Sequence, residues 1–235
     1  MIRLENVTLT YPSGKTVFRD LSLTLPTDRR LAVLGRTESG KTSLINLLAG
    51  TDDVTSGRIE RYARLSFPAG FQRGFRMANT GRQNAMFAAK IYNADPEEVF
   101  RFVAAVSKLG PMMERPMREW SAQARIMFAY LLTYTLPFDT YVFDNVLGPN
   151  TPEMREVWIR LFEARTRTGG AILATRQPRT AEQFCDCALV MLASGPVFFD
   201  DIRDGLAAFR DEPAPAVAPA ATAPAPAPVV AEPGN

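Results

Sequence analysis

The feature that most constrains this chain is a phosphate-binding motif set between a strand-like and a helix-like segment. Residues 35–42 fit the pattern G-x-x-x-x-G-K-[ST] and directly follow the apolar run 31–34. The next residues, 43–48, have the composition of a helix. A glycine-rich turn points its N–H groups inward at one anion, and the helix that follows adds its positive N-terminal dipole. The pattern predicts a nucleotide-binding α/β protein.

The chemistry of the motif assigns a role to its polar residues. Lys41 is expected to reach the terminal phosphates of ATP, and Thr42 is expected to ligate Mg²⁺. The motif alone would equally fit a kinase or a GTPase, so the rest of the chain must distinguish these classes. The residues expected to bind nucleotide here are Gly35, Arg36, Thr37, Glu38, Ser39, Gly40, Lys41, Thr42 and Ser43.

Apolar segments of strand length alternate with helical stretches, which is typical of an α/β fold with a largely parallel sheet. The insert 95–134 has the apolar spacing of helices, and we expect a helical subdomain over about 85–134 within one domain, 1–211. The Ala/Pro-rich stretch 212–235 predicts a disordered tail. The expected strands cover residues 2–9, 30–34, 141–144, 171–175, 188–192 and 197–199.

Composition argues against two classes of protein. Lys and Arg number 27 against 25 for Asp and Glu, without the basic excess that nucleic-acid binding usually leaves, so we expect no nucleic-acid partner. No apolar run approaches the ~20 residues of a membrane-spanning helix, and the N-terminus does not resemble a secretory signal. These observations predict a cytoplasmic protein.

Two cysteines, Cys185 and Cys187, lie two residues apart at the expected start of a strand, so the pleat should direct both to one face. A metal site needs further ligands. Because the chain has no histidine and no other cysteine, a structural role is favoured for both.

Three further pairs of segments identify a family. Residues 11–12 with 18–26, residues 67–71 with 80–84, and residues 198–202 with 206–209 resemble the ABC nucleotide-binding subunits of capsular-polysaccharide exporters. The resemblance covers roughly residues 1–210. It implies an ABC-type α/β domain with a mostly parallel core sheet, an antiparallel β edge and a helical subdomain.

The same resemblance implies that Tyr11 stacks on the adenine base, the alternative being an ordinary half-buried strand residue. Asp144 closes the apolar segment 140–144, and a carboxylate at the C-terminal end of a parallel strand can hold Mg²⁺ through water. We interpret Asp144 as the Walker B aspartate; the alternative is an aspartate that merely starts a turn.

The chain departs from the family where hydrolysis is concerned. The family's water-polarising glutamate corresponds to Asn145, whose amide cannot accept a proton, and its switch histidine corresponds to Arg176. The Q-loop glutamine corresponds to Arg76, although a shifted alignment would place Gln72 there. ATP hydrolysis is therefore expected to be slow or absent.

The family's Leu-Ser-Gly-Gly-Gln signature corresponds to residues 120–124, where only the serine, Ser121, is kept. In the family this segment completes the ATP site of the partner subunit. Side chains at Ala122 and Gln123 would crowd the approach of backbone N–H groups to the γ-phosphate. If the site uses another base, Glu119 and Asp139 are the next carboxylates to consider.

The resemblance implies a peripheral subunit at the cytoplasmic face of the inner membrane. It would dock on a membrane permease through the helical subdomain and close on a second cassette, as a homodimer or heterodimer, when ATP and Mg²⁺ bind. Closure requires only tighter nucleotide contact in the closed state, so it can occur without fast hydrolysis. The alternative is a catalytically weak pseudo-ATPase that regulates or scaffolds an envelope polysaccharide export complex.

Overall fold

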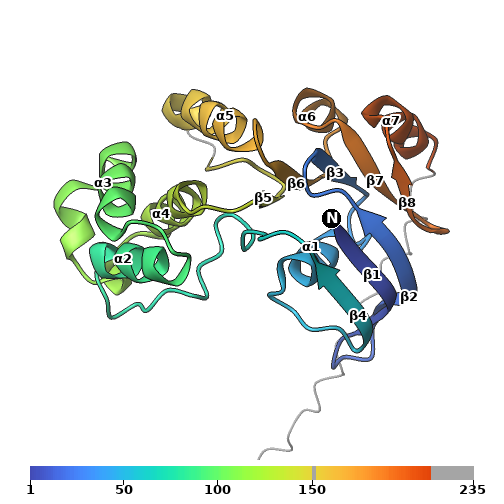
Figure 1. The fold of residues 1–235 in the computed structure, drawn as a ribbon, viewed down its shortest axis with the longest axis horizontal. Helices are drawn as coiled ribbons and strands as arrows, with labels where there is room; N and C mark the ends of the chain where they lie inside the picture. The colour runs from blue at the N-terminus through green and yellow to red at the C-terminus, as the bar shows by residue number, and fades with distance from the viewer. Residues whose placement is uncertain (150–151, 213–235) are drawn as a thin grey trace, which may run out of the picture.

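The computed structural model describes residues 1–149 and 152–212. Apart from Glu212, the expected tail lies outside the described residues. Within these two ranges, no helix combines the length and apolar character needed to cross a membrane. Figure 1 shows an elongated molecule with one group of helices at one end and two sheets, with further helices beside them, at the other.

The larger sheet has five strands in the order β5-β6-β3-β7-β8. β3 pairs in parallel with β6 and β7, β5 pairs in parallel with β6, and β8 is antiparallel to β7. The carboxyl ends of the four parallel strands therefore meet at one edge. All five strands were predicted to within two residues at each end; they are β3 (Arg30–Leu34), β5 (Thr140–Asp144), β6 (Gly170–Thr175), β7 (Cys187–Leu192) and β8 (Gly195–Phe199).

A second, antiparallel sheet has the order β2-β1-β4. It consists of β1 (Ile2–Thr10), β2 (Thr16–Leu25) and β4 (Ser56–Arg61). β1 and β2 form the opening hairpin that the family resemblance predicted. β4 was not anticipated, because its sequence, Ser-Gly-Arg-Ile-Glu-Arg, has one apolar residue and forms a strand by pairing with β1.

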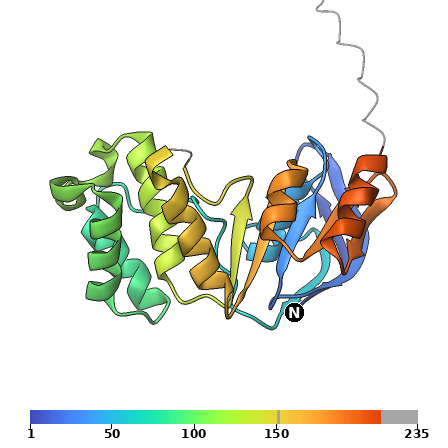
Figure 2. The same ribbon diagram turned by 90° about the horizontal axis from the view of Figure 1, so that it is seen from above.

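The helices α2, α3 and α4 lie together at one end of the molecule, as Figures 1 and 2 both show. Side-chain caps fix where they begin: Thr80 accepts from the Gln83 N–H, Asp95 from the Glu98 N–H, and Ser121 from the Ala124 N–H. The helices are α1 (Lys41–Ala49), α2 (Gly81–Ile91), α3 (Pro96–Ser107), α4 (Ala122–Thr135), α5 (Pro152–Thr166), α6 (Pro178–Phe184) and α7 (Ile202–Asp211), with short 3₁₀ turns η1 (Gly110–Glu114) and η2 (Met117–Glu119).

β3 is buried on both faces of the larger sheet. Its residues alternate between two apolar clusters, with Ala32 and Leu34 in one and Leu31 and Val33 in the other. Burial on both faces explains why the strand is a continuous apolar run without polar alternation. The loop that follows β3 is thus built on a rigid, fully buried base.

The expectation that the two cysteines share one face is wrong. Cys185 is the C-cap residue of α6, and β7 begins only at Cys187, so the strand pleat does not include Cys185. The two side chains lie in different apolar clusters, and both are buried free thiols. Burial raises the pKa of Cys187 to about 11, which keeps the thiol protonated and unreactive at neutral pH.

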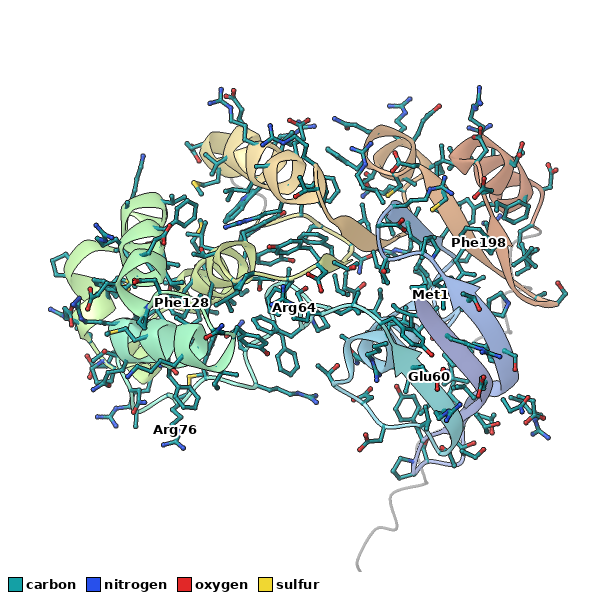
Figure 3. The ribbon with its side chains drawn as sticks, viewed as in Figure 1. Met1, Glu60, Arg64, Arg76, Phe128 and Phe198 are labelled. Carbon is teal, nitrogen blue, oxygen red and sulfur yellow. The ribbon has the colours of Figure 1, made fainter. Side chains whose placement is uncertain are left out.

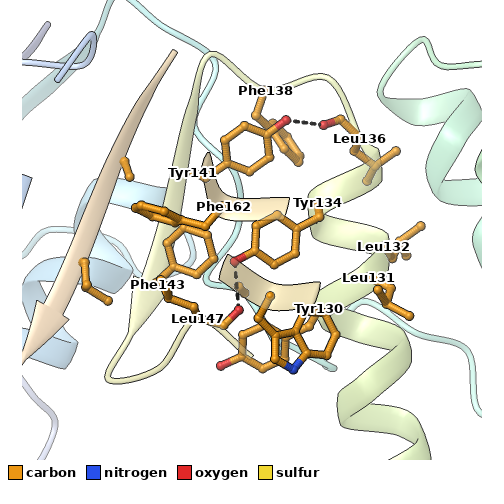
Figure 4. Close-up of a cluster of buried hydrophobic side chains, with 14 of the residues drawn as sticks. Tyr130, Leu131, Leu132, Tyr134, Leu136, Phe138, Tyr141, Phe143, Leu147 and Phe162 are labelled. Atoms are coloured by element: carbon orange, nitrogen blue, oxygen red, sulfur yellow. Dashed lines mark hydrogen bonds between the residues drawn. The ribbon is translucent and has the colours of Figure 1, made fainter. Parts of the chain in front are cut away.

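An aromatic cluster attaches α4 to the edge of the sheet (Figure 4). Tyr134 of α4 lies against Phe143 of β5 with ring centroids 5.4 Å apart, and its hydroxyl donates to the Leu147 carbonyl at 2.8 Å. Phe143 in turn meets Phe162 of α5 edge-on at 5.6 Å. Because these rings are buried and the hydroxyl is bonded, the cluster holds α4 in one orientation on the sheet.

Candidate functional site

The loop between β3 and α1 is shaped to receive an anion. Gly40, which precedes α1, has a φ of 87°, and no side chain among the described residues caps the first turn of the helix. A Cβ on Gly35 would lie 2.4 Å from Ser39 Oγ and 2.9 Å from Met191 Cβ, so only glycine fits there. The N–H groups at the start of α1 therefore face an uncapped space that suits phosphate oxygens.

Lys41 lies within this loop. Its Nζ donates to the Arg36 carbonyl at 2.6 Å and to Ser39 Oγ at 3.2 Å. Burial lowers the pKa of Lys41, and the positive charge of Arg176 lowers it further, while Asp144 acts in the opposite direction. The ammonium is thus held close to the helix N-terminus, where the same phosphates would lie.

Thr42 and Asp144 meet although they are far apart in sequence. Thr42 Oγ1 donates to Asp144 Oδ2 at 3.0 Å, because the carboxyl ends of β3 and β5 lie at the same edge of the sheet. Asn145 Nδ2 donates to Asp144 Oδ1 at 2.9 Å. A hydroxyl and a carboxylate are oxygen ligands of the type that Mg²⁺ prefers, so the pair fits that ion.

Asn145 and Arg176 follow β5 and β6 at this same edge. Asn145 has a φ of 69°, a left-handed conformation that asparagine adopts more readily than most residues, and its N–H donates to the Ala174 carbonyl at 2.8 Å. Arg176 Nη1 donates to Thr37 Oγ1 at 3.1 Å, which brings its charge against the loop. Both residues therefore lie beside the phosphate loop.

Tyr11 lies at one side of a cleft of about 320 Å³ that the loop residues Glu38 to Ser43 also line. Its hydroxyl donates to Ser43 Oγ at 3.0 Å. Lys15, Thr16 and Val17 complete the cleft, and none of them was among the predicted site residues. The turn that follows Tyr11 was the available signal, because a hairpin places the start of the second strand opposite the end of the first.

Arg76 lies apart from this edge. Its N–H donates to Asn84 Oδ1 at 3.0 Å and its guanidinium is 5.9 Å from the Phe87 ring centroid, both on α2. Figure 3 shows its side chain at the outer surface below α2. Gln72 lies closer in sequence to the segment beside β5, where the Ala69 N–H donates to the Val142 carbonyl at 2.8 Å.

The signature positions also lie away from the loop of their own chain. Ser121 caps α4, its Oγ accepting from the Ala124 N–H at 3.2 Å, and Ala122 and Gln123 are exposed in the first turn. No hydrogen bond among the described residues connects these three residues with the phosphate loop of the same chain. Any part they take in a nucleotide site requires a second chain.

The two alternative carboxylates do not reach the site. Asp139 precedes β5 and so lies at the opposite edge of the sheet from Asp144, where its Oδ1 pairs with Arg64 Nη2 at 3.0 Å. The hydrogen bond from Arg64 lowers the pKa of Asp139, which makes it a poorer base. Glu119 belongs to η2, next to α4 and away from the sheet. Neither replaces a base beside Asp144.

Comparison of the sequence with known proteins identifies one family. Residues 18–127 match the family model described as ABC transporter. The ATP-binding protein BexA of Haemophilus influenzae is 32% identical over 81% of this chain and 89% of its own length. The capsule polysaccharide export ATP-binding protein CtrD of Neisseria meningitidis is 30% identical over 86% of this chain and 95% of its own.

The chain belongs to the ABC transporter ATP-binding proteins. The polysialic acid transport ATP-binding protein KpsT of Escherichia coli is 29% identical to this ABC protein and is covered over 96% of its length. Among solved structures, a dimeric ATP-binding cassette bound to ADP and phosphate has a TM-score of 0.63 at 15% identity and covers 81% of this chain and 94% of its own. The predicted α/β class with a mostly parallel sheet and an antiparallel sheet is confirmed.

Proposed function

We propose that this ABC protein is the ATP-binding subunit of an exporter of capsular or other cell-surface polysaccharide. The observation that carries the proposal is a complete phosphate loop, with Thr42 bonded to Asp144, in a chain that aligns over 86% of its length with a capsule polysaccharide export ATP-binding protein. Relatives named for export favour this role over a non-transporting regulator.

ATP would bind with its phosphates against the N-terminus of α1. The loop amides and Lys41 would hold the β- and γ-phosphates. Thr42 would hold Mg²⁺ directly and Asp144 would hold it through water. Tyr11 would stack on the base. Mg²⁺ held by Thr42 and Asp144 would neutralise negative charge on the phosphates. Lys41 already lies at the loop, so binding requires it to exchange the Arg36 carbonyl for phosphate oxygens.

Hydrolysis would be slow. Asn145 donates to Asp144 and cannot take a proton from water, and Arg176 adds a positive charge but no base. Binding alone can drive closure on a second cassette. In a homodimer, Ser121, Ala122 and Gln123 of the second copy would approach the γ-phosphate from the uncovered side. The transport cycle then depends mainly on the affinity difference between the closed and open states.

The permease would dock on a cleft of about 280 Å³ between the end of α1 and α2. Phe87 and Ile91 line it, and they are 50% and 59% exposed, which is unusual for side chains of this size. Exposed apolar side chains beside a concave surface mark a protein contact. A subunit docked in this way would be peripheral to the cytoplasmic face of the inner membrane.

Docking is tested with an Ile91→Asp variant. It should lose co-purification with the permease while retaining ATP binding, because the charge falls in the cleft and far from the phosphate loop. The matched control is Tyr62→Asp, which changes a side chain that is 61% exposed and absent from the lining of the cleft. Equal retention of the permease by both variants would refute the docking site.

Export is tested in the native host by deleting the gene and measuring surface and intracellular polysaccharide. Polymer should disappear from the surface and accumulate inside the cell. The wild-type gene should restore export, and a Lys41→Ala gene should not. Normal surface polysaccharide in the deletion strain would overturn the proposal.

A further inference from the structure

The C-terminal end of α7 contacts the phosphate loop through one side chain. Arg36, the second residue of the loop motif, directs its guanidinium away from the loop toward α7. Its Nη2 donates to the Glu212 carbonyl at 2.6 Å, and its Cζ lies 5.8 Å from the centroid of the Phe209 ring. An arginine over an aromatic face at this distance is a cation–π contact.

The helix end that receives Arg36 is itself fixed to the sheet. Glu212 Oε1 accepts from the Ala193 N–H at 2.7 Å, in the turn between β7 and β8. Farther up α7, a Cβ on Gly205 would lie 2.4 Å from Ala188 Cβ of β7, so helix and strand are in close contact. Phe209 is only 9% exposed. Arg36 is thus held by a rigid part of the domain.

The backbone of Arg36 in turn positions Lys41. The Arg36 carbonyl accepts from Lys41 Nζ at 2.6 Å and from the Ser39 N–H at 3.4 Å. Arg36 Nε is buried without a hydrogen-bond partner among the described residues, which is unfavourable for a charged group. Solvation therefore does not explain this placement of the guanidinium, whereas its contacts with α7 do.

We infer that Phe209 and Glu212 are positioning residues of the nucleotide site, acting on Lys41 and the loop amides through Arg36. Their side of the loop borders a hollow of about 350 Å³ lined by Arg36, Thr37, Arg176 and Phe209. Release of Arg36 would let the first half of the loop move and would misplace the amides that bind phosphate. The inference rests on the proposed binding of ATP to this loop.

The test combines a readout on the nucleotide-free protein with one on binding. In Phe209→Ala, amide hydrogen exchange in the peptide covering residues 35–41 should become faster, and the affinity for a fluorescent ATP analogue should fall about three- to tenfold, the range of one cation–π contact. Phe209→Tyr keeps the ring and should restore both values. Leu206→Ala is the control, because Leu206 is buried on the same helix but does not line the hollow.

Arg36→Met removes the guanidinium without changing the core of α7, and it keeps the test decisive if Phe209→Ala does not fold. This variant should accelerate amide exchange in the same peptide and lower the affinity for the ATP analogue by a similar factor. Unchanged exchange in folded Phe209→Ala or Arg36→Met would overturn the inference, as would an equal effect of Leu206→Ala. If wild type does not bind the analogue, the proposed function fails, while the exchange comparison still decides whether α7 orders the loop.

Discussion

The phosphate loop after β3 and the two positions after β5 and β6 lie at one edge of one sheet. They differ in how closely their residues match the motifs of the ABC family. The loop matches its motif throughout, and Lys41 and Thr42 are bonded inside the site. Asn145 and Arg176 follow the neighbouring strands β5 and β6, and the family resemblance aligns them with a glutamate and a histidine. Phosphate binding depends on backbone N–H groups and one lysine, whereas hydrolysis depends on specific side chains, so one edge can keep the first and lose the second.

The largest effect is expected when the family's residues are introduced at positions 145 and 176. Asn145→Glu combined with Arg176→His should raise ATP turnover, because it returns a water-polarising carboxylate and a γ-phosphate sensor to the site. General-base assistance is typically worth ~10²- to 10⁴-fold, and a steady-state ATPase assay would detect part of it. Glutamate at the left-handed φ of 69° costs on the order of 1 kcal/mol in stability, which a folded domain tolerates.

The matched control is Arg176→His alone, which should change turnover little, since a sensor without a polarising group has no water to position. If wild type already hydrolyses ATP at rates usual for ABC ATPases and the double variant adds nothing, the contrast between the two groups of residues is wrong.

The binding half of the comparison is tested by Lys41→Ala. Loss of the ammonium removes charge-assisted contacts to two phosphates, and the affinity for an ATP analogue in the presence of Mg²⁺ should fall about a hundredfold or more. Lys15→Ala, in the same cleft but outside the loop motif, should have a smaller effect. Equal affinity of wild type and Lys41→Ala would show that this loop does not hold the phosphates.

A pH titration tests whether Arg176 acts on Lys41 of the phosphate loop. Burial and Arg176 lower the pKa of Lys41, so its ammonium loses the proton at a lower pH than an ordinary lysine. Affinity for ATP should therefore fall as pH rises through this lowered pKa, by up to about tenfold per pH unit. Arg176→Gln removes the neighbouring positive charge and should shift the fall to higher pH. An unchanged profile would mean that Arg176 does not act on Lys41.

The smallest effect is expected from the tail. Truncation after Glu212 removes an Ala/Pro-rich stretch with no apolar periodicity but keeps the contact between Arg36 and Glu212. The melting temperature and the affinity for ATP should both stay close to wild type in a thermal-shift assay and a titration. A loss of many degrees would show that the tail packs on the domain.

The sequence by itself determined the parts of this protein whose geometry is local. A strand, a glycine-rich turn and a helix in succession specify the loop over 35–42 without help from the rest of the chain, and both the strand over 30–34 and the helix after the loop are confirmed. The meeting of Thr42 with Asp144 also followed, because parallel strands end at the same edge of a sheet.

Only the tertiary structure decided what depends on contacts between distant segments. Arg36 contacts Phe209 and Glu212, which lie more than 170 positions away, and no local sequence pattern predicts that contact. Asp139 was separated from Asp144 by the direction of β5. Cys185 was separated from Cys187 because it caps the end of α6, whereas Cys187 is the first residue of β7. Side-chain partners follow from packing between elements, and the spacing of residues along the chain does not encode that packing.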